Sequence, residues 1–173
     1  MGRVRSPNPV LLFVGTLYCD DNVFRNAYEL LAKHFGEILF TGFPIPWDYS
    51  KYYHNEIGYP LLRRFLFFKT LIYPGDLADI KIQTNKIEDM LSYEDKRRIN
   101  LDPGYLTLSK IVLASTKNYA HRIYLGKGIY GEVTLIYREG TYKPHIFSYM
   151  DYQDKFYIET FMNIRSLYKK MLR

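Results

Sequence analysis

Residues 10–43 read VLLFVGTLYCDDNVFRNAYELLAKHFGEILFTGF, and this stretch decides the fold. Residues 10–18 are apolar on both alternating faces, which is typical of a central strand. Asp20 and its neighbours then supply N-cap side chains, apolar residues recur at helical spacing, and Gly36 is a natural helix terminator. A second strand is predicted over 37–43. The chain therefore opens with a β-α-β unit.

The next part of the chain predicts a long connection and a strand–helix pair. Residues 44–62 contain three prolines and predict an irregular loop, and long loops are often functional. Residues 64–73 predict another central strand. Residues 77–91 predict a helix, in which Asp76 caps the N-terminus and Asp79 occupies the third position.

The second half of the chain is harder to interpret. The Asp102-Pro103-Gly104 sequence predicts a turn. We favour a helix over 106–117 with Thr107 near its N-cap, although a buried strand fits the same apolar run. Strands joined by glycine-containing turns and a final amphipathic helix are then predicted. Their ranges are 123–125, 129–137, 142–147 and 157–171.

This order of elements predicts a single α+β domain over residues 1–173. The first five elements fit a ferredoxin-like split β-α-β core with a mostly antiparallel sheet. We expect C-terminal β-hairpins to extend that sheet and a C-terminal helix to complete the domain. A more nearly parallel sheet is the alternative.

The composition excludes a membrane-spanning or disordered chain. No apolar run approaches the roughly 20 residues that span a bilayer. Of the 173 residues, 47% are hydrophobic and 24% are charged, which is ordinary for a globular protein. The one cysteine, Cys19, cannot form an intramolecular disulfide. We expect a cytoplasmic protein without a membrane partner.

The sequence lacks the common signatures of catalysis and cofactor binding. It has no phosphate-binding P-loop, no dinucleotide-binding glycine motif, no nucleophile elbow and no zinc-protease helix. Its four histidines are far apart and show no ligand spacing. We therefore predict no metal site, and no cofactor can be named from the sequence.

Several phrases of the sequence resemble a bacterial family known only as domain of unknown function 4416. They are FPIPWDYSKYY (43–53), LLRRF (61–65), YPGDLADIKIQTN (73–85), DPGYLTLSKIVLASTK (102–117) and HRIYLGKGIYGEVTLIY (121–137). The resemblance covers almost the whole chain and implies no established activity, substrate or catalytic residue. It implies alanine where this chain has Gly131, a difference that concerns strand packing.

Three polar residues form a candidate catalytic set. If Val133 and Leu135 face the core from their strand, Glu132 stands on the opposite, open face. His121 precedes the neighbouring strand, and Lys69 is a basic residue in an apolar strand that should need a partner. His121, Glu132 and Lys69 are therefore candidates for acid–base chemistry on a phosphate ester. The alternative is structural, with Glu132 paired at the surface, His121 ending a helix and Lys69 extending into solvent.

Positive charge and tyrosine together indicate a second kind of site. The net charge is +6 and there are 18 tyrosines. Basic side chains neutralise phosphates and aromatic rings stack on bases, although a scattered basic surface is the plainer explanation. The candidate ligand-binding residues are Asp48, Tyr49, Tyr52, Tyr53, Arg63, Arg64, Asp102, Tyr105, Arg122 and Tyr130. Arg97 and Arg98 are further candidates for phosphate contact.

Three functions fit these observations. The leading prediction is binding of a phosphate-bearing ligand, either a nucleotide or RNA, by a basic, Tyr-rich face. The first alternative is a hydrolase or transferase that acts on a phosphate ester. The second is a non-catalytic protein-interaction domain.

Overall fold

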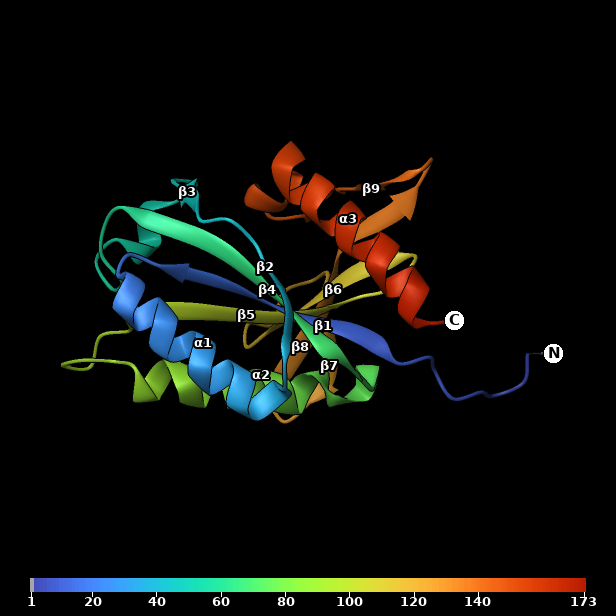
Figure 1. Cartoon of the computed structure of the whole chain (residues 1–173), viewed down its shortest axis with the longest axis horizontal. Helices are drawn as coiled ribbons and strands as arrows, with labels where there is room; N and C mark the ends of the chain where they lie inside the picture. Colours follow the sequence, from blue (N-terminus) through green and yellow to red (C-terminus); the bar gives the residue numbers. More distant parts are fainter. Residues whose placement is uncertain (1) are drawn as a thin grey trace.

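The computed structural model describes residues 2–173 (Figure 1). In chain order the elements are β1 (Val10–Tyr18), α1 (Asp21–Phe35), β2 (Ile38–Thr41), β3 (Ile45–Trp47), η1 (Lys51–Tyr53), β4 (Leu61–Ile72), η2 (Pro74–Asp76), α2 (Leu77–Met90), β5 (Ile99–Leu106), β6 (Lys110–Ser115), β7 (Ile123–Gly126), β8 (Ile129–Arg138), β9 (Thr141–Lys143), η3 (Asp151–Gln153) and α3 (Lys155–Met171). Within these residues the strands form a nine-stranded sheet of order β2-β4-β1-β5-β6-β8-β7. In it β3 pairs with β4, and β9 pairs with β8.

The predicted ferredoxin-like core is confirmed. Its four strands lie in the order β2-β4-β1-β5, and β1 is antiparallel to both β4 and β5. The helices α1 and α2 lie on one face of the sheet, and α3 covers the other (Figure 1). Leu31 and Ile87 belong to the apolar core on the first face, and Phe65 and Phe161 belong to the core under α3.

The start of α1 follows from local chemistry that the sequence predicts correctly. The Asp20 side chain accepts a hydrogen bond from the N–H of Asn22 at 2.8 Å. Gly36 ends the helix with φ of +93°, a backbone conformation that favours glycine. The predicted C-terminal helix is likewise present as α3.

The prediction of a helix over 106–117 is wrong, because Leu106 ends strand β5 and residues 110–115 form strand β6. Its central residues Ile111, Val112 and Leu113 are all buried, and they pack on both faces of the sheet. A buried strand and a buried helix share such an apolar run, so burial on both sides decides the outcome. Thr107 does not cap a helix but accepts from the N–H of Lys110 in the turn that joins β5 to β6.

The predicted turn at Asp102-Pro103-Gly104 is also wrong, because all three residues lie within β5. Gly104 is needed here for space. A Cβ atom on Gly104 would lie 2.4 Å from the carbonyl oxygen of Val112 and 2.6 Å from Cζ of Phe13. The glycine therefore permits close packing within the sheet and does not mark a reversal of the chain.

Strand β8 contains a bulge that overturns the expected sharing of one face by Val133 and Leu135. Ile111 pairs with Leu135 and Val112 pairs with Val133, so Thr134 is an extra residue without a partner on β6. Val133 then packs on the α2 side, whereas Leu135 belongs to the core under α3. Glu132 is only 4% exposed and does not stand on an open face.

Two smaller predictions also fail. Asp76 makes no side-chain hydrogen bond to the start of α2. The connection over 44–62 is not wholly irregular, because it contains β3 and the short helix η1. Among residues 2–173, no helix combines the length and apolar character that crossing a membrane requires.

We predict that Gly104→Ala destabilises the protein much more than Gly131→Ala does. The first places a methyl group against backbone and ring atoms of the sheet, and should lower the free energy of unfolding by about 3 kcal/mol. The second meets only the exposed Leu125 side chain, whose Cδ1 lies 3.0 Å away. Its effect should stay within about 1 kcal/mol. Urea denaturation measures both, and equal stability of the two variants would contradict the packing described.

Candidate functional site

The candidate site lies where β5 and β6 separate. Pairing between these strands covers only Gly104–Leu106 and Ile111–Leu113. The preceding residue on β5 is Pro103, which has no N–H and cannot continue the ladder of hydrogen bonds. From Pro103 back to Ile99, β5 is paired with β1 alone. The space beside this half of β5 is open.

Two side chains of α2 occupy the unpaired edge of β5. Lys81 Nζ donates to the carbonyl of Leu101 at 2.8 Å, and Glu88 Oε1 accepts from the N–H of Leu101 at 2.5 Å. Both side chains are buried. Burial raises the pKa of the Glu88 carboxyl, and attraction to Lys81 opposes that rise. The buried backbone of β5 is thereby satisfied without a second strand.

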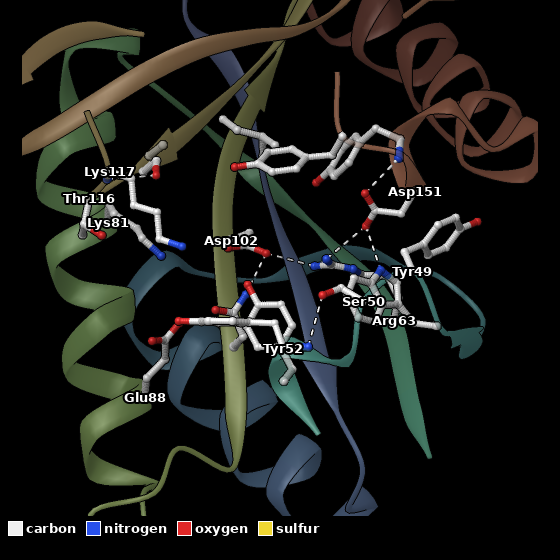
Figure 2. A pocket seen from close by; sticks show the side chains of 18 of the residues that line it. Tyr49, Ser50, Tyr52, Arg63, Lys81, Glu88, Asp102, Thr116, Lys117 and Asp151 are labelled. Atoms are coloured by element: carbon white, nitrogen blue, oxygen red, sulfur yellow. Dashed lines mark hydrogen bonds and ion pairs between the residues drawn. The ribbon is translucent and has the colours of Figure 1, made fainter. Parts of the chain in front are cut away.

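A cavity of about 710 Å³ occupies the opening, a volume typical of small-molecule sites. Its wall comes from residues 47–53, from β4 and β5, from residues 113–117 at the end of β6, and from residues 149–152 before α3. Helix α2 contributes Lys81 and Glu88. Figure 2 shows these groups facing one another across the cavity.

Arg63 is the centre of one buried ion-pair cluster in the wall. Its guanidinium donates to Asp102 at 3.0 Å and to Asp151 at 3.1 Å (Figure 2). Trp47 Nε1 donates to the same oxygen of Asp151 at 2.9 Å, and Asn100 donates to Asp102 at 2.7 Å. Burial opposes the charged form of Asp102, but Arg63 and these hydrogen bonds hold its pKa below its usual value. The cluster joins β4 and β5 to the segment before α3.

Glu132 is the centre of a second cluster, on the β8 side of the cavity. Its Oε2 atom accepts from Arg122 Nε at 2.7 Å and lies 2.9 Å from His121 Nε2. The His121 ring stacks on Phe147 with centroids 4.6 Å apart. Glu132 Oε1 is buried and has no hydrogen-bond partner within residues 2–173. Glu132 lines the cavity, so this unsatisfied oxygen lies in its wall.

Aromatic rings of the 47–53 segment form the remaining wall. Tyr53 packs edge-on against both Trp47 and Tyr52, with centroids 5.7 Å and 4.9 Å apart. Burial raises the pKa of Tyr53, so its phenol is neutral at ordinary pH. Lys117 is exposed, and its Nζ lies 5.2 Å from the Tyr52 ring centroid. No carboxylate of residues 2–173 forms an ion pair with Lys117, so its charge is available to a ligand.

The structure brings more than half of the predicted site residues together. Those that line the cavity are Tyr49, Tyr52, Tyr53, Arg63, Arg97, Asp102 and Glu132. His121 and Arg122 do not line it, but both are bonded to Glu132, which does. Arg122 also donates to the hydroxyl of Tyr149, and burial raises the pKa of that phenol to about 12.

Two predicted residues on β4 lie outside this cluster. Lys69 does have the partner it was expected to need, but that partner is Glu37, at 2.8 Å, and both side chains are more than half exposed. Arg64 follows Arg63 directly and therefore points to the opposite face of the sheet. There its Nε donates to the carbonyl of Gly42 at 2.8 Å. Neither residue lines the cavity.

Three further predicted residues also lie elsewhere. Asp48 is exposed, with His54 as a distant partner at 3.9 Å. Tyr105 packs on the α2 side of β5, and Tyr130 packs against Tyr124 of β7 with centroids 5.3 Å apart. Their positions follow from strand pairing, which the sequence does not reveal.

Every arginine predicted to contact phosphate has an internal partner in the structure. These partners are Asp102 and Asp151 for Arg63, Gly42 for Arg64, Glu56 and Glu88 for Arg97, Asp20 for Arg98, and Glu132 for Arg122. Their charges are therefore engaged in holding the fold together.

Sequence reasoning missed more cavity residues than it found. Among the missed residues are Trp47, Lys81, Glu88, Asn100, Lys117, Tyr149 and Asp151. Lys81 and Glu88 sit seven positions apart, which places them on one face of a helix, but nothing local shows that this face meets a strand edge. Asp151 carries no motif. Its pairing with Arg63 spans 88 positions of the chain and exists only in the folded protein.

The family model described as Domain of unknown function (DUF4416) matches residues 8–168. The chain belongs to this family. Neither the curated proteins nor the solved structures contain a significant match to the DUF4416 chain. Among residues 2–173 no group of three or more His, Cys, Asp or Glu side chains is placed to hold a metal ion.

We predict that Asp102→Asn lowers the free energy of unfolding by about 2 kcal/mol at pH 7, because the buried Arg63 guanidinium loses one of the two carboxylates that balance its charge. The folded-state pKa of Asp102 is depressed, so its contribution is present above the ordinary carboxyl range and is lost as the pH falls through the folded value. The difference between the wild-type protein and the variant should therefore shrink below about pH 4. Urea denaturation at pH 7 and pH 3 measures it.

Asp48→Asn is the matched control, since this carboxylate is exposed and weakly paired. It should change stability by less than about 0.5 kcal/mol at either pH. A loss of stability in Asp102→Asn that is independent of pH would show that the ion pair with Arg63 is not its source.

Proposed function

We propose that this cavity binds a phosphate-bearing small molecule of the nucleotide class. The observation that carries the proposal is the juxtaposition at one cavity of the Tyr52 and Tyr53 rings with the Lys117 ammonium, which no carboxylate of residues 2–173 pairs with. Aromatic rings stack on bases, and a lysine neutralises a phosphate. A cavity of about 710 Å³ has the size of a small-molecule site.

A nucleotide suits this cavity better than an RNA strand does. Extended RNA sites need a series of basic side chains along an open groove. Here the arginines near the cavity are each held by carboxylates, and Lys117 is the lining cation left without an internal partner in residues 2–173. RNA binding with a steep dependence on salt would therefore point to another surface. As part of the same proposal, the protein works in the bacterial cytoplasm, in keeping with its single cysteine.

The binding proposal is tested by titrating purified protein with AMP in an isothermal titration calorimeter. We predict that Lys117→Ala weakens AMP binding about tenfold, because one charge-assisted contact is worth about 1.4 kcal/mol. Tyr52→Ala should weaken it by a similar factor, and Tyr52→Phe should restore it because the ring is retained.

Lys69→Ala is the matched control for the loss of a lysine, because Lys69 lies outside the cavity and its ion pair is exposed. It should leave the affinity for AMP unchanged. The absence of nucleotide binding by the wild-type protein at millimolar concentration would reject the proposal. Equal losses in Lys117→Ala and Lys69→Ala would reject this cavity as the site.

A second candidate function is hydrolysis or transfer of a phosphate ester at the same cavity. The specific observation in its favour is the 2.9 Å contact between His121 Nε2 and Glu132 Oε2, the reach that proton transfer requires. In this scheme Glu132 holds His121, which takes a proton from the attacking water or alcohol and returns it to the leaving oxygen. Lys69 has no part in it, because it lies outside the cluster.

We predict that, if this second function operates, His121→Ala lowers turnover of a nucleotide ester at least a hundredfold, the usual contribution of a general acid–base group. AMP binding should persist in that variant. His34→Ala is the control, since His34 lies on α1 and contacts Gln83 at the surface. Unchanged turnover in His121→Ala, measured by phosphate release, would leave binding as the function of the site.

Protein interaction remains the third possibility, and it needs a surface instead of a cavity. Large apolar side chains are exposed on β7 and after β9, at Ile123, Tyr124, Ile146 and Met150. Such residues are common on protein surfaces when scattered singly. They give this function less support than the cavity gives to ligand binding.

A further inference from the structure

The free edge of β6 faces the cavity, and its direction can be derived from the hydrogen bonds around it. The carbonyl of Lys110 accepts from Thr107 on the β5 side, and the carbonyl of Ser109 accepts from Tyr137 on the β8 side. Backbone polar groups alternate in direction along a strand. The C=O of Ala114 is therefore directed toward β5, as that of Lys110 is. Ser115 is the last residue of β6, and its C=O is directed toward β8, so the N–H of Thr116, on the opposite side of the same trans peptide, is directed toward β5.

Strand β5 offers no partner to either group. Pairing of β5 with β6 stops at Gly104 and Leu113, and the next residue, Pro103, has no N–H to give to the Ala114 carbonyl. Beyond Pro103, the C=O and the N–H of Leu101 are already hydrogen-bonded to side chains of α2. Ala114 and Thr116 both line the cavity. The protein therefore presents an acceptor and, two residues later, a donor to whatever occupies the cavity.

The groups around this edge define what a ligand must offer. A ligand that carries a hydrogen-bond donor next to an acceptor on one rigid edge matches the Ala114 carbonyl and the Thr116 N–H. The 6-amino group and the neighbouring ring nitrogen of adenine have that arrangement. The Tyr52 ring is close to the same edge, since Lys117 follows Thr116 and lies over that ring. Glu132 pairs with Leu113 across β6 and β8, and its buried Oε1 has no partner within the described residues.

We propose that the ligand is an adenine nucleotide whose base lies edge-on to β6 at Ala114 and Thr116. This rests on the proposed nucleotide-binding function and adds the identity of the base. The base amino group donates to the Ala114 carbonyl, and the ring nitrogen accepts from the Thr116 N–H. Tyr52 stacks on the base, and Lys117 contacts the phosphate at the mouth of the cavity.

The first arm of the test varies the base. AMP, N6,N6-dimethyl-AMP and GMP are titrated into the wild-type protein by calorimetry. Dimethylation removes the donor from the amino group, and guanine reverses the order of donor and acceptor. Each should bind at least tenfold more weakly than AMP, since an unpaired buried polar group opposes binding. Equal affinity for all three nucleotides would overturn the base assignment while leaving nucleotide binding intact.

The second arm varies the protein. Thr116→Pro removes the N–H that the base requires, whereas Thr116→Ala keeps it. Residue 116 follows the end of β6, and the extended backbone before it suits a following proline. Thr116→Ala should bind AMP as the wild-type protein does, and Thr116→Pro should lose at least tenfold in affinity. Comparable losses in both variants would also overturn the assignment.

Two further outcomes are decided within the same experiment. If Thr116→Pro has an altered circular dichroism spectrum or melting temperature, the comparison of the three nucleotides on the wild-type protein decides the assignment alone. If ribose 5-phosphate binds as tightly as AMP, the site recognises the sugar phosphate and the base assignment is rejected. If none of these compounds binds, the nucleotide-binding function itself fails.

Discussion

At Pro103 strand β5 loses the amide that would continue its ladder with β6, and the arrangement of the cavity depends on this loss. A strand in mid-sheet with one unpaired edge needs other partners for its buried backbone groups. Lys81 and Glu88 supply them from α2, which fixes that helix beneath the opening. Gly104 has the opposite effect one residue later, because its missing side chain lets β5 and β6 approach closely. Strands β5 and β6 are therefore paired from Gly104 onward and separated from Pro103 backward.

The charged residues around the opening fall into two groups. Arg63, Arg97 and Arg122 are held by carboxylates. These pairs connect β4 to β5, the segment before β5 to the segment before β4, and the segment before β7 to β8. Removing one member of such a pair leaves a buried charge uncompensated, which is strongly destabilising. Lys117 and the Oε1 atom of Glu132 form the second group, because within residues 2–173 no carboxylate pairs with Lys117 and no hydrogen bond reaches Glu132 Oε1. Of this second group, Lys117 is exposed and its charge can meet a ligand.

Sequence reasoning succeeded where neighbouring residues control the outcome. The cap at Asp20, the terminator at Gly36 and the amphipathic pattern of α3 are local signals, and each gave the correct element. It failed at 102–117, where Asp102-Pro103-Gly104 has the composition of a turn and the following apolar run fits two structures. The site was half predicted. The tyrosines of 49–53, Arg63, Asp102 and Glu132 line the cavity, whereas Lys69, Arg64, Asp48, Tyr105 and Tyr130 do not.

The sequence by itself determined the α+β class, the split β-α-β opening, the final helix and the family, because these depend on short-range patterns and on recognisable phrases. The tertiary structure alone decided which polar residues meet. Asp151 reaches Arg63 across 88 positions, and a single extra residue in β8 moves Leu135 to the face opposite Val133. Side-chain direction in a sheet reverses with every residue, so the register between distant strands, which no local pattern encodes, sets the contents of the cavity.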